Sequence, residues 1–206
     1  LPKGVAISHA AAINTILAVN AQHGVNANDR VLGISALHFD LSVWDIFATL
    51  ACGASLIILP ELAVKEARSY LSLVRQHTIT IWNSVPALLE MGLALLENGE
   101  FQNDVSSLRL FMLSGDWVNV SLAPRLKKHL AHARLVVMGG ATEAAIWSNY
   151  HVVDEIDSSW TSVPYGKPLP NQKFRVVNEL FQDSPDWVEG ELWIGGSGVA
   201  QGYFGD

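Results

Sequence analysis

Hydrophobic and polar positions follow two alternating patterns over the first 150 residues. Short apolar runs, bounded by Gly, Pro or polar residues, occur at 30–35, 55–60, 78–84, 108–115 and 134–140. Between them lie longer segments with apolar residues at helical spacing, at 40–53, 63–77, 86–96 and 121–132. Continuous apolar strands that alternate with amphipathic helices predict a mostly parallel β-sheet with helices on both faces. We therefore expect an α/β fold over residues 1–150.

Two of the helical segments show the pattern in detail. The first, over 40–53, carries Val43, Ile46, Phe47 and Leu50 and ends at Gly53. The second, over 63–77, places Val64, Ala67, Tyr70, Leu71 and Val74 on one face. Spacings of three and four residues are typical of a helix that buries one side, so both segments are predicted to cover the sheet.

The pattern changes from about Ser148 onward. Short apolar segments at 148–153, 173–178 and 190–196 are separated by Pro, Gly, Asn and Asp, with no long helical segment between them. Such a series is typical of antiparallel strands, and we expect it to begin a small β-barrel. We place a boundary near 150–165, between an α/β subdomain at 1–150 and a β-rich subdomain at 151–206.

Composition narrows the possible functions. The chain has 206 residues, of which 50% are hydrophobic and 16% charged, and its formal net charge is −7 without a basic cluster. This charge argues against a nucleic-acid partner, and no apolar run approaches the roughly 20 residues of a membrane span. The single cysteine, Cys52, excludes an internal disulfide and fits a reducing, cytoplasmic compartment. Both ends fall within motifs, so we expect a segment of a longer polypeptide.

Three short motifs carry candidate chemistry, and each has a plain structural alternative. Lys3 follows a proline and precedes a glycine, which is also typical of a surface turn. Asp40 precedes a predicted helix and could cap it. Thr142 and Glu143 follow two glycines at the end of a predicted strand. A hydroxyl and a carboxylate placed there could bind a phosphate and its metal ion, or could cap a helix.

Other motifs are weaker. The glycines at 196, 198 and 202 do not match G-x-G-x-x-G, because Gln201 occupies the last required position. Residues 195–199 likewise miss the last glycine of a nucleophile elbow. His129 and His132 share a predicted helix face, but no acidic residue or cysteine has metal-site spacing with them.

The order of the motifs is more specific than any one of them. Along the chain stand Leu1–Gly4 (LPKG), Phe39–Ser42 (FDLS), Ser114–Asp116 (SGD), Gly139–Glu143 (GGATE) and Gly190–Tyr203 (GELWIGGSGVAQGY). This series resembles the amino-acid adenylation domains of nonribosomal peptide synthetases, in the adenylate-forming superfamily. The resemblance covers the whole chain. It implies the large N-terminal part of such an enzyme, with the C-terminal lid domain absent.

The resemblance implies an activity and its machinery. Such domains use ATP and Mg²⁺ to convert an amino acid to an aminoacyl-adenylate with release of pyrophosphate, and then load it onto the phosphopantetheine thiol of a carrier domain. A condensation or cyclisation domain is expected in the same synthetase. By position, Lys3 lies near the triphosphate, Thr142 binds a phosphate and Glu143 binds Mg²⁺. The remaining ATP-binding positions are Gly115, Gly139, Gly140 and Ala141. Gly139 departs from the family, which often has there a tyrosine that stacks on adenine.

The same comparison of positions implies the residues that line the amino-acid pocket. They are Asp40, Leu41, Trp44, Asn83, Met112, Ser114, Met138, Ile146 and Trp147. A carboxylate such as Asp40 in an apolar pocket needs a cation, which the α-ammonium of an amino acid supplies. The bulky lining leaves room for a small side chain and resembles cysteine-activating domains, although Trp44 and Met138 differ from their commonest pattern. Serine and alanine remain open, because size alone discriminates by only about 1–3 kcal/mol.

Two alternatives remain at this point. One is a carboxylic acid:CoA ligase of the same superfamily, from which Asp40 distinguishes an amino-acid-activating enzyme. The other is a non-catalytic binding module derived from the fold. In the family, a ribose-binding aspartate and a lid lysine lie downstream, so we also expect residues 1–206 alone to be largely inactive.

Overall fold

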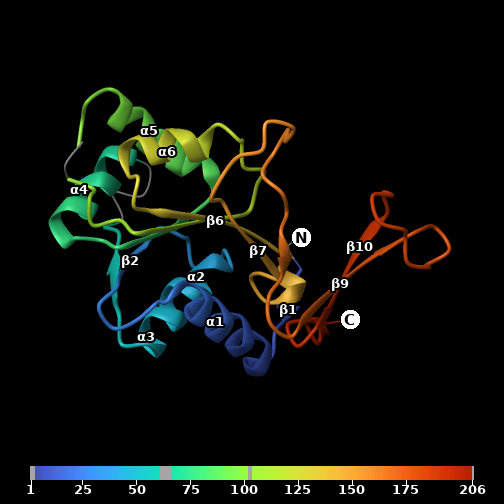
Figure 1. Ribbon diagram of the computed structural model, residues 1–206. Helices are drawn as coiled ribbons and strands as arrows, with labels where there is room; N and C mark the ends of the chain where they lie inside the picture. The colour runs from blue at the N-terminus through green and yellow to red at the C-terminus, as the bar shows by residue number, and fades with distance from the viewer. Residues whose placement is uncertain (1–2, 61–65, 102–103, 206) are drawn as a thin grey trace.

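The computed structural model describes residues 3–60, 66–101 and 104–205. Its centre is a seven-stranded sheet with the order β3-β2-β4-β5-β6-β7-β8 (Figure 1). The parallel strands are β2 (Arg30–Gly33), β3 (Ser55–Ile58), β4 (Ile81–Ser84), β5 (Leu110–Leu113) and β6 (Arg134–Gly139), and the antiparallel ones are β7 (Asn149–Val152) and β8 (Lys167–Pro168). The predicted α/β fold with a mostly parallel sheet is confirmed.

Helices cover both faces of this sheet (Figure 1). One face carries α4 (Ala67–His77), α5 (Pro86–Glu97) and α6 (Leu122–His129), and the other carries α1 (His9–His23), α2 (Leu41–Val43), the π-helix Trp44–Ala48 and α3 (Thr49–Ala51). Successive strand residues divide between the two sides: Trp82 and Phe111 pack in the first apolar layer, and Ile81 and Met112 in the second. Burial on both faces explains why the strands read as continuous apolar runs.

The helix predictions hold with three differences. The helix over 121–132 ends at His129. The segment 40–53 is helical but contains the π turn, and it buries Leu41 and Trp44 while Phe47 and Leu50 are 57% and 63% exposed. In the segment 63–77, Ala67, Tyr70, Leu71 and Val74 are buried, and Val64 lies outside the described residues.

Helix α1 was not predicted, although the sequence contains both of its ends. The Ser8 side chain accepts a hydrogen bond of 3.1 Å from the backbone N–H of Ala11, which caps the first turn. At the other end Gly24 adopts φ 61°, the left-handed conformation common after a helix. These two residues are the signals from which the helix could have been found.

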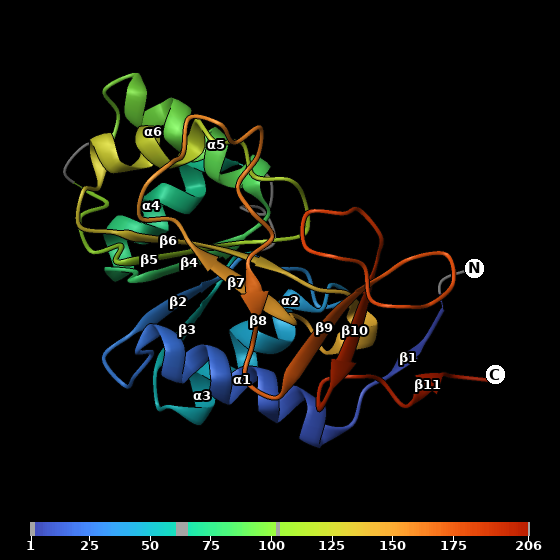
Figure 2. The same cartoon turned by 45° about the vertical axis from the view of Figure 1, so that its right-hand side comes forward.

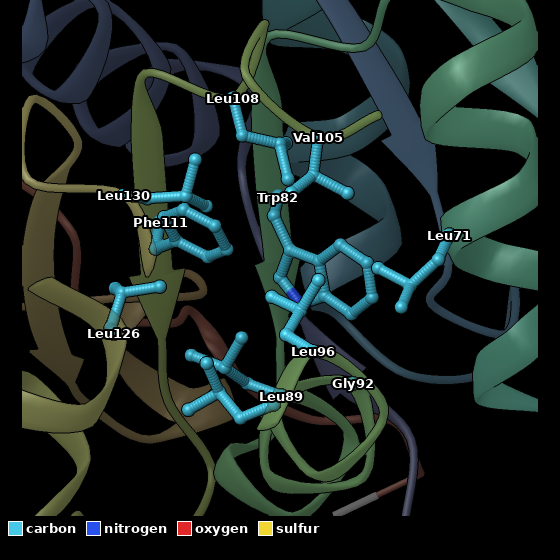
Figure 3. Close-up of a pocket in the computed structure, with 11 residues that line it drawn as sticks. Leu71, Trp82, Leu89, Gly92, Leu96, Val105, Leu108, Phe111, Leu126 and Leu130 are labelled. Carbon is cyan, nitrogen blue, oxygen red and sulfur yellow. The ribbon is translucent and has the colours of Figure 1, made fainter. Parts of the chain in front are cut away.

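The apolar layer under α4, α5 and α6 is closely packed. Leu71, Trp82, Leu89, Phe111 and Leu126 project toward one another in Figure 3. The space left among these side chains is about 10 Å³, which is at the lower limit for a single water molecule. This region is therefore structural core, and any ligand site must lie elsewhere.

Two short antiparallel ribbons lie beside the sheet (Figure 2). Strand β9 (Gln172–Val177) pairs antiparallel with β10 (Glu191–Gly196), and β1 (Val5–Ala6) pairs antiparallel with β11 (Gly202–Tyr203). Because β7 and β8 continue the central sheet past residue 150, the subdomain boundary near 150–165 stays a prediction. In the ranges that the structure describes, no helix is long and apolar enough to cross a membrane.

The end of β6 is packed too closely for any side chain. A Cβ added to Gly139 would lie 2.2 Å from Cε2 of Tyr165 and 2.6 Å from Oδ1 of Asn149. A Cβ added to Gly195 in β10, by contrast, would have no atom within 4 Å.

Gly139→Ala is expected to lower the free energy of unfolding by about 1–3 kcal/mol, because the methyl group must displace the Tyr165 ring. Gly195→Ala is the matched control and should leave stability within about 0.5 kcal/mol of the wild type. Urea denaturation of both variants measures the difference. Equal stabilities would show that Tyr165 yields to the methyl group without cost.

Candidate functional site

The loops that follow β2, β5 and β6 meet at the carboxyl edge of the sheet, the edge where open α/β sheets bind ligands. They enclose a cavity of about 180 Å³. Its lining residues are Phe39, Asp40, Leu41, Ser114, Gly115, Gly140, Ala141, Thr142, Ile146 and Trp147. Five of the nine predicted pocket residues and four of the predicted phosphate-side residues thus lie around one space.

Asp40 and Thr142 contact each other directly. The Thr142 hydroxyl donates a hydrogen bond of 2.7 Å to Oδ2 of Asp40. Asp40 occupies the N-cap position of α2, yet its side chain makes no capping hydrogen bond, and none of the ion pairs among the described residues includes it. The geometry therefore does not support the capping alternative for Asp40. The carboxylate is half-buried beside apolar side chains and has a free oxygen.

Glu143 points to the opposite side, toward the β1–β11 ribbon. The Tyr203 hydroxyl donates a hydrogen bond of 2.7 Å to Oε1 of Glu143, and the Lys3 ammonium lies 5.0 Å from the centre of the Tyr203 ring. The hydrogen bond from Tyr203, with smaller contributions from a backbone hydrogen bond and the charge of Lys3, lowers the pKa of Glu143. The site thus keeps Glu143 ionised, next to a cation. The other residues of the first motif, Leu1 and Pro2, lie outside the described residues.

The loop after β6 has a strained backbone. Ala145 and Ile146 adopt φ angles of 57° and 71°, which are uncommon for residues with a side chain and most of all for a β-branched one. The Thr15 hydroxyl holds this conformation through a hydrogen bond of 2.9 Å to the carbonyl oxygen of Ala145. Strain of this kind concentrates at functional loops. Residues 142–144 form one 3₁₀ turn, and neither Thr142 nor Glu143 caps it.

The other four predicted pocket residues lie behind the cavity in the packed core. They are Trp44, Asn83, Met112 and Met138, each at most 2% exposed. Trp44 contacts Trp147 with ring centres 5.9 Å apart, and Nε1 of Trp147 donates to the Ser114 hydroxyl at 3.0 Å. Trp44 therefore packs behind Trp147, which lines the cavity beside Asp40.

A second cavity of about 470 Å³ adjoins the first. It is lined by Gly115, Asp116, Trp117, Val118, Val137, Met138, Gly139, Gly140, Val163 and Tyr165. The two cavities share Gly115 and Gly140. Burial raises the pKa of the Tyr165 hydroxyl, against a backbone hydrogen bond with Gly140 that lowers it.

Three residues of this region were not assigned a role from the sequence. Tyr203 holds Glu143, Tyr165 lines the second cavity, and Asp45 supports Asn83.

Asp45 is 2% exposed and its Oδ1 accepts a hydrogen bond of 2.8 Å from Nδ2 of Asn83. Burial raises the pKa of Asp45 to about 7, although hydrogen bonds with Asn83 and Ser35 oppose the shift. The role of Asp45 is recognised only from its burial next to the Asn83 amide, and the sequence does not show burial.

The donor set at Glu143 fits Mg²⁺ that is shared with a phosphate ligand. The described residues contain no group of three or more His, Cys, Asp or Glu that could hold a metal ion by themselves. Mg²⁺ commonly takes one or two carboxylates, and fills its remaining positions with water and substrate phosphates. One exposed carboxylate next to a glycine-rich loop agrees with that mode of binding.

Comparison with known proteins identifies the family. The sequence model of the AMP-binding enzyme family matches residues 1–204. This chain belongs to the AMP-binding enzyme family. It is 51% identical over 207 aligned residues to pyochelin synthetase PchE of Pseudomonas aeruginosa, and 49% identical to the anguibactin system regulator of Vibrio anguillarum. Both alignments cover the whole chain, but only 14% and 20% of the relatives.

A solved structure agrees in fold. The nonribosomal peptide synthetase FmoA3 in its AMPPNP-bound form has a TM-score of 0.96 and 39% identity, with 100% of this chain and 22% of that chain covered. The family is one of adenylate-forming ligases, and this chain is part of an adenylation domain of the nonribosomal peptide synthetase type. The chain spans a fifth or less of the length of these curated relatives.

The buried Asp45 predicts a pH-dependent stability. Its folded pKa of about 7 lies above the ordinary 3.8, so between pH 4 and 7 the folded chain keeps a proton that the unfolded chain loses. This group therefore lowers the free energy of unfolding as pH rises through that window, by at most about 1.4 kcal/mol per pH unit. Asp45→Asn removes the effect, and its stability relative to the wild type should increase from pH 5 to pH 7.

Urea denaturation at the two pH values measures this difference. Asp186→Asn, in an exposed segment, is the control for loss of one negative charge. A wild type and an Asp45→Asn variant with the same pH dependence would contradict the raised pKa.

Proposed function

We propose that this chain is the part of an adenylation domain that binds a small amino acid, with L-cysteine as the favoured substrate, and the phosphates of ATP. The observation that carries the proposal is Asp40: a half-buried carboxylate without a capping bond, on a small cavity, next to Thr142 and a glycine-rich loop. An α-ammonium group supplies the cation that this carboxylate needs. The substrate carboxylate would then face the phosphate side of the same cavity.

The reaction needs positioning and charge stabilisation more than covalent chemistry from the protein. A carboxylate oxygen of the amino acid attacks the α-phosphorus of ATP, the bond to the bridging oxygen breaks, and pyrophosphate leaves with that electron pair. Asp40 would hold the ammonium, while the Thr142 hydroxyl and the backbone of Gly140 and Ala141 would hold phosphate oxygens. Glu143 would hold Mg²⁺, an ion that would supply positive charge to the phosphates. Lys3 lies on the Glu143 side and would add positive charge there.

The size of the cavity supports a small side chain. About 180 Å³ is available in front of Trp147 and Ile146, and Trp44 packs against Trp147. FmoA3 has been solved with α-methyl-L-serine-AMP and a Vibrio cholerae adenylation domain, AlmE, with glycyl-adenosine-5′-phosphate, so similar folds hold adenylates of small amino acids. Ser114 lines the cavity as a polar residue, and Asn83 lies in the core behind it. Cysteine is favoured over serine and alanine by the resemblance of the nine-residue lining.

The setting of the domain belongs to the same proposal. The relatives are long synthetases, so we propose a carrier domain with a phosphopantetheine thiol, and a condensation or cyclisation domain, in the same polypeptide. The ribbons β9–β10 and β1–β11 would be the start of a small barrel, and a lid domain would complete the active site. Within this proposal, residues 1–206 alone have little adenylation activity, and the assays below use the complete domain.

Two other functions are less well supported. The substrate of a carboxylic acid:CoA ligase has no ammonium group, so it would leave the Asp40 carboxylate without a cation. A non-catalytic module would have no need for the strained loop that brings Thr142 and Glu143 to opposite sides. The experiments below distinguish both of these functions from amino-acid activation.

ATP–pyrophosphate exchange with a panel of acids tests the substrate. We expect exchange with L-cysteine to exceed that with L-serine and L-alanine by about 10-fold or more. The des-amino analogue 3-mercaptopropionate should give little exchange, since Asp40 would remain unpaired. Exchange with 3-mercaptopropionate or aryl acids alone would indicate the acyl ligase, and no exchange with any acid would indicate the binding module.

Glu143→Gln tests the metal role. The exchange rate at low Mg²⁺ should fall about 100-fold, and half-saturation should move to higher Mg²⁺, because the amide is a poor ligand for this ion. The control is Glu90→Gln on α5, which is exposed and on the other side of the sheet. A Glu143→Gln variant with an unchanged Mg²⁺ dependence would contradict the assignment.

A further inference from the structure

The second cavity has the chemistry of a slot for a flat apolar ring. Val118, Val137, Met138 and Val163 form its buried walls, and the glycines at 115, 139 and 140 contribute backbone only. The exposed residues Asp116, Trp117 and Tyr165 complete the lining. It shares Gly115 and Gly140 with the cavity that Asp40 and Thr142 line. An apolar slot beside a cavity that carries a carboxylate and a hydroxyl fits a ligand with an aromatic end and a charged end.

Tyr165 is the aromatic ring that is fixed at this slot. Its ring stacks on Phe174, with ring centres 6.2 Å apart and an angle of 21° between the planes. Phe174 is not among the residues that line the slot, and Tyr165 is still 47% exposed, so the face away from Phe174 is the free one. A rigid aromatic ring with one free face is suited to stacking.

The surrounding chain is arranged to keep the ring in place. Tyr165 occupies the space where a side chain at position 139 would begin, 2.2 Å from a Cβ built on Gly139. The Asn149 side-chain amide donates to the carbonyl oxygen of Tyr165. A Cβ on the next residue, Gly166, would lie 2.2 Å from the carbonyl oxygen of Tyr150. The glycine at 139 and the tyrosine at 165 are therefore one packed unit at the end of β6.

We propose that Tyr165 is the platform on which the adenine ring of ATP stacks, an assignment that rests on the proposed function. The phosphates then extend through the shared glycines toward Thr142. The absence of a side chain at Gly139 is compensated by a ring that enters from a distant segment of the chain. Tyr165 acts by binding the nucleotide and takes no part in bond formation.

Trp117 is the other aromatic residue at the slot. It is 81% exposed, whereas Tyr165 is held by Phe174 and by the end of β6. Ordering a free side chain costs conformational entropy that a fixed ring does not. This difference favours Tyr165, and Trp117→Leu tests the rival ring. Trp187, which is fully exposed and does not line the slot, is the matched aromatic control.

The test is calorimetric titration of the complete adenylation domain with ATP and, separately, with inorganic tripolyphosphate. Tyr165→Leu should raise the Kd for ATP about 10- to 100-fold, the loss typical of one aromatic stack on a base. Tyr165→Phe should stay within about 3-fold of the wild type, as should the control Trp187→Leu. All variants should bind tripolyphosphate like the wild type, which also shows that they are folded.

Each other result has a distinct meaning. Unchanged ATP binding by Tyr165→Leu, or a loss confined to Trp117→Leu, would overturn the role of Tyr165 and leave the proposed function intact. Equal weakening of ATP and tripolyphosphate by Tyr165→Leu would also overturn it, because the effect would then be on the loop and not on the base. No ATP binding by the wild-type domain would overturn both proposals.

Discussion

The central sheet is buried on both faces, and this burial decides where the chain can place polar chemistry. Residues on one side of β4 and β5 pack under three helices, and those on the other side pack against α1 and the π-helix segment. Large side chains such as Trp44, Trp82 and Trp147 are fully enclosed. Ligand-binding groups can therefore emerge only where strands end. Asp40, Ser114 and Thr142 all follow the carboxyl ends of parallel strands, and for that reason they meet.

In the loop after β6, a few residues determine which segments of the chain pack together. Gly139 and Gly140 allow close approach by Tyr165 on one side and by the backbone of residues 147–148 on the other. The turn that follows separates two neighbouring side chains: Thr142 faces Asp40 and Glu143 faces Tyr203. The hydrogen bonds to Asp40 and from Tyr203 reach beyond the turn, and they join three distant segments of the chain.

The sequence predicted the sheet and most of its helices, because these depend on periodicity. It also named pocket residues, five of which the fold brings around one cavity. It did not predict α1, whose ends are marked by Ser8 and Gly24 but whose apolar pattern is weak, with Ile13 and Leu17 more than half exposed. It also did not distinguish, among pocket residues, Leu41 at the cavity from Met112 in the core behind it. Depth below a surface depends on how the layers pack, and a linear motif does not contain that information.

Tyr165 and Asp45 are further residues whose roles the linear sequence does not predict. Each acts through a contact with a residue far away in the sequence, Gly139 and Asn83 respectively. Each partner is itself conspicuous in the sequence: Gly139 as a departure from a family tyrosine, and Asn83 as a polar residue in an apolar strand. The unusual residue thus indicated that a compensating contact must exist, and only the fold could identify it. The GGATE segment lies between two such contacts: Tyr165 from a later turn packs against Gly139, and Asp40 from an earlier loop accepts a hydrogen bond from Thr142.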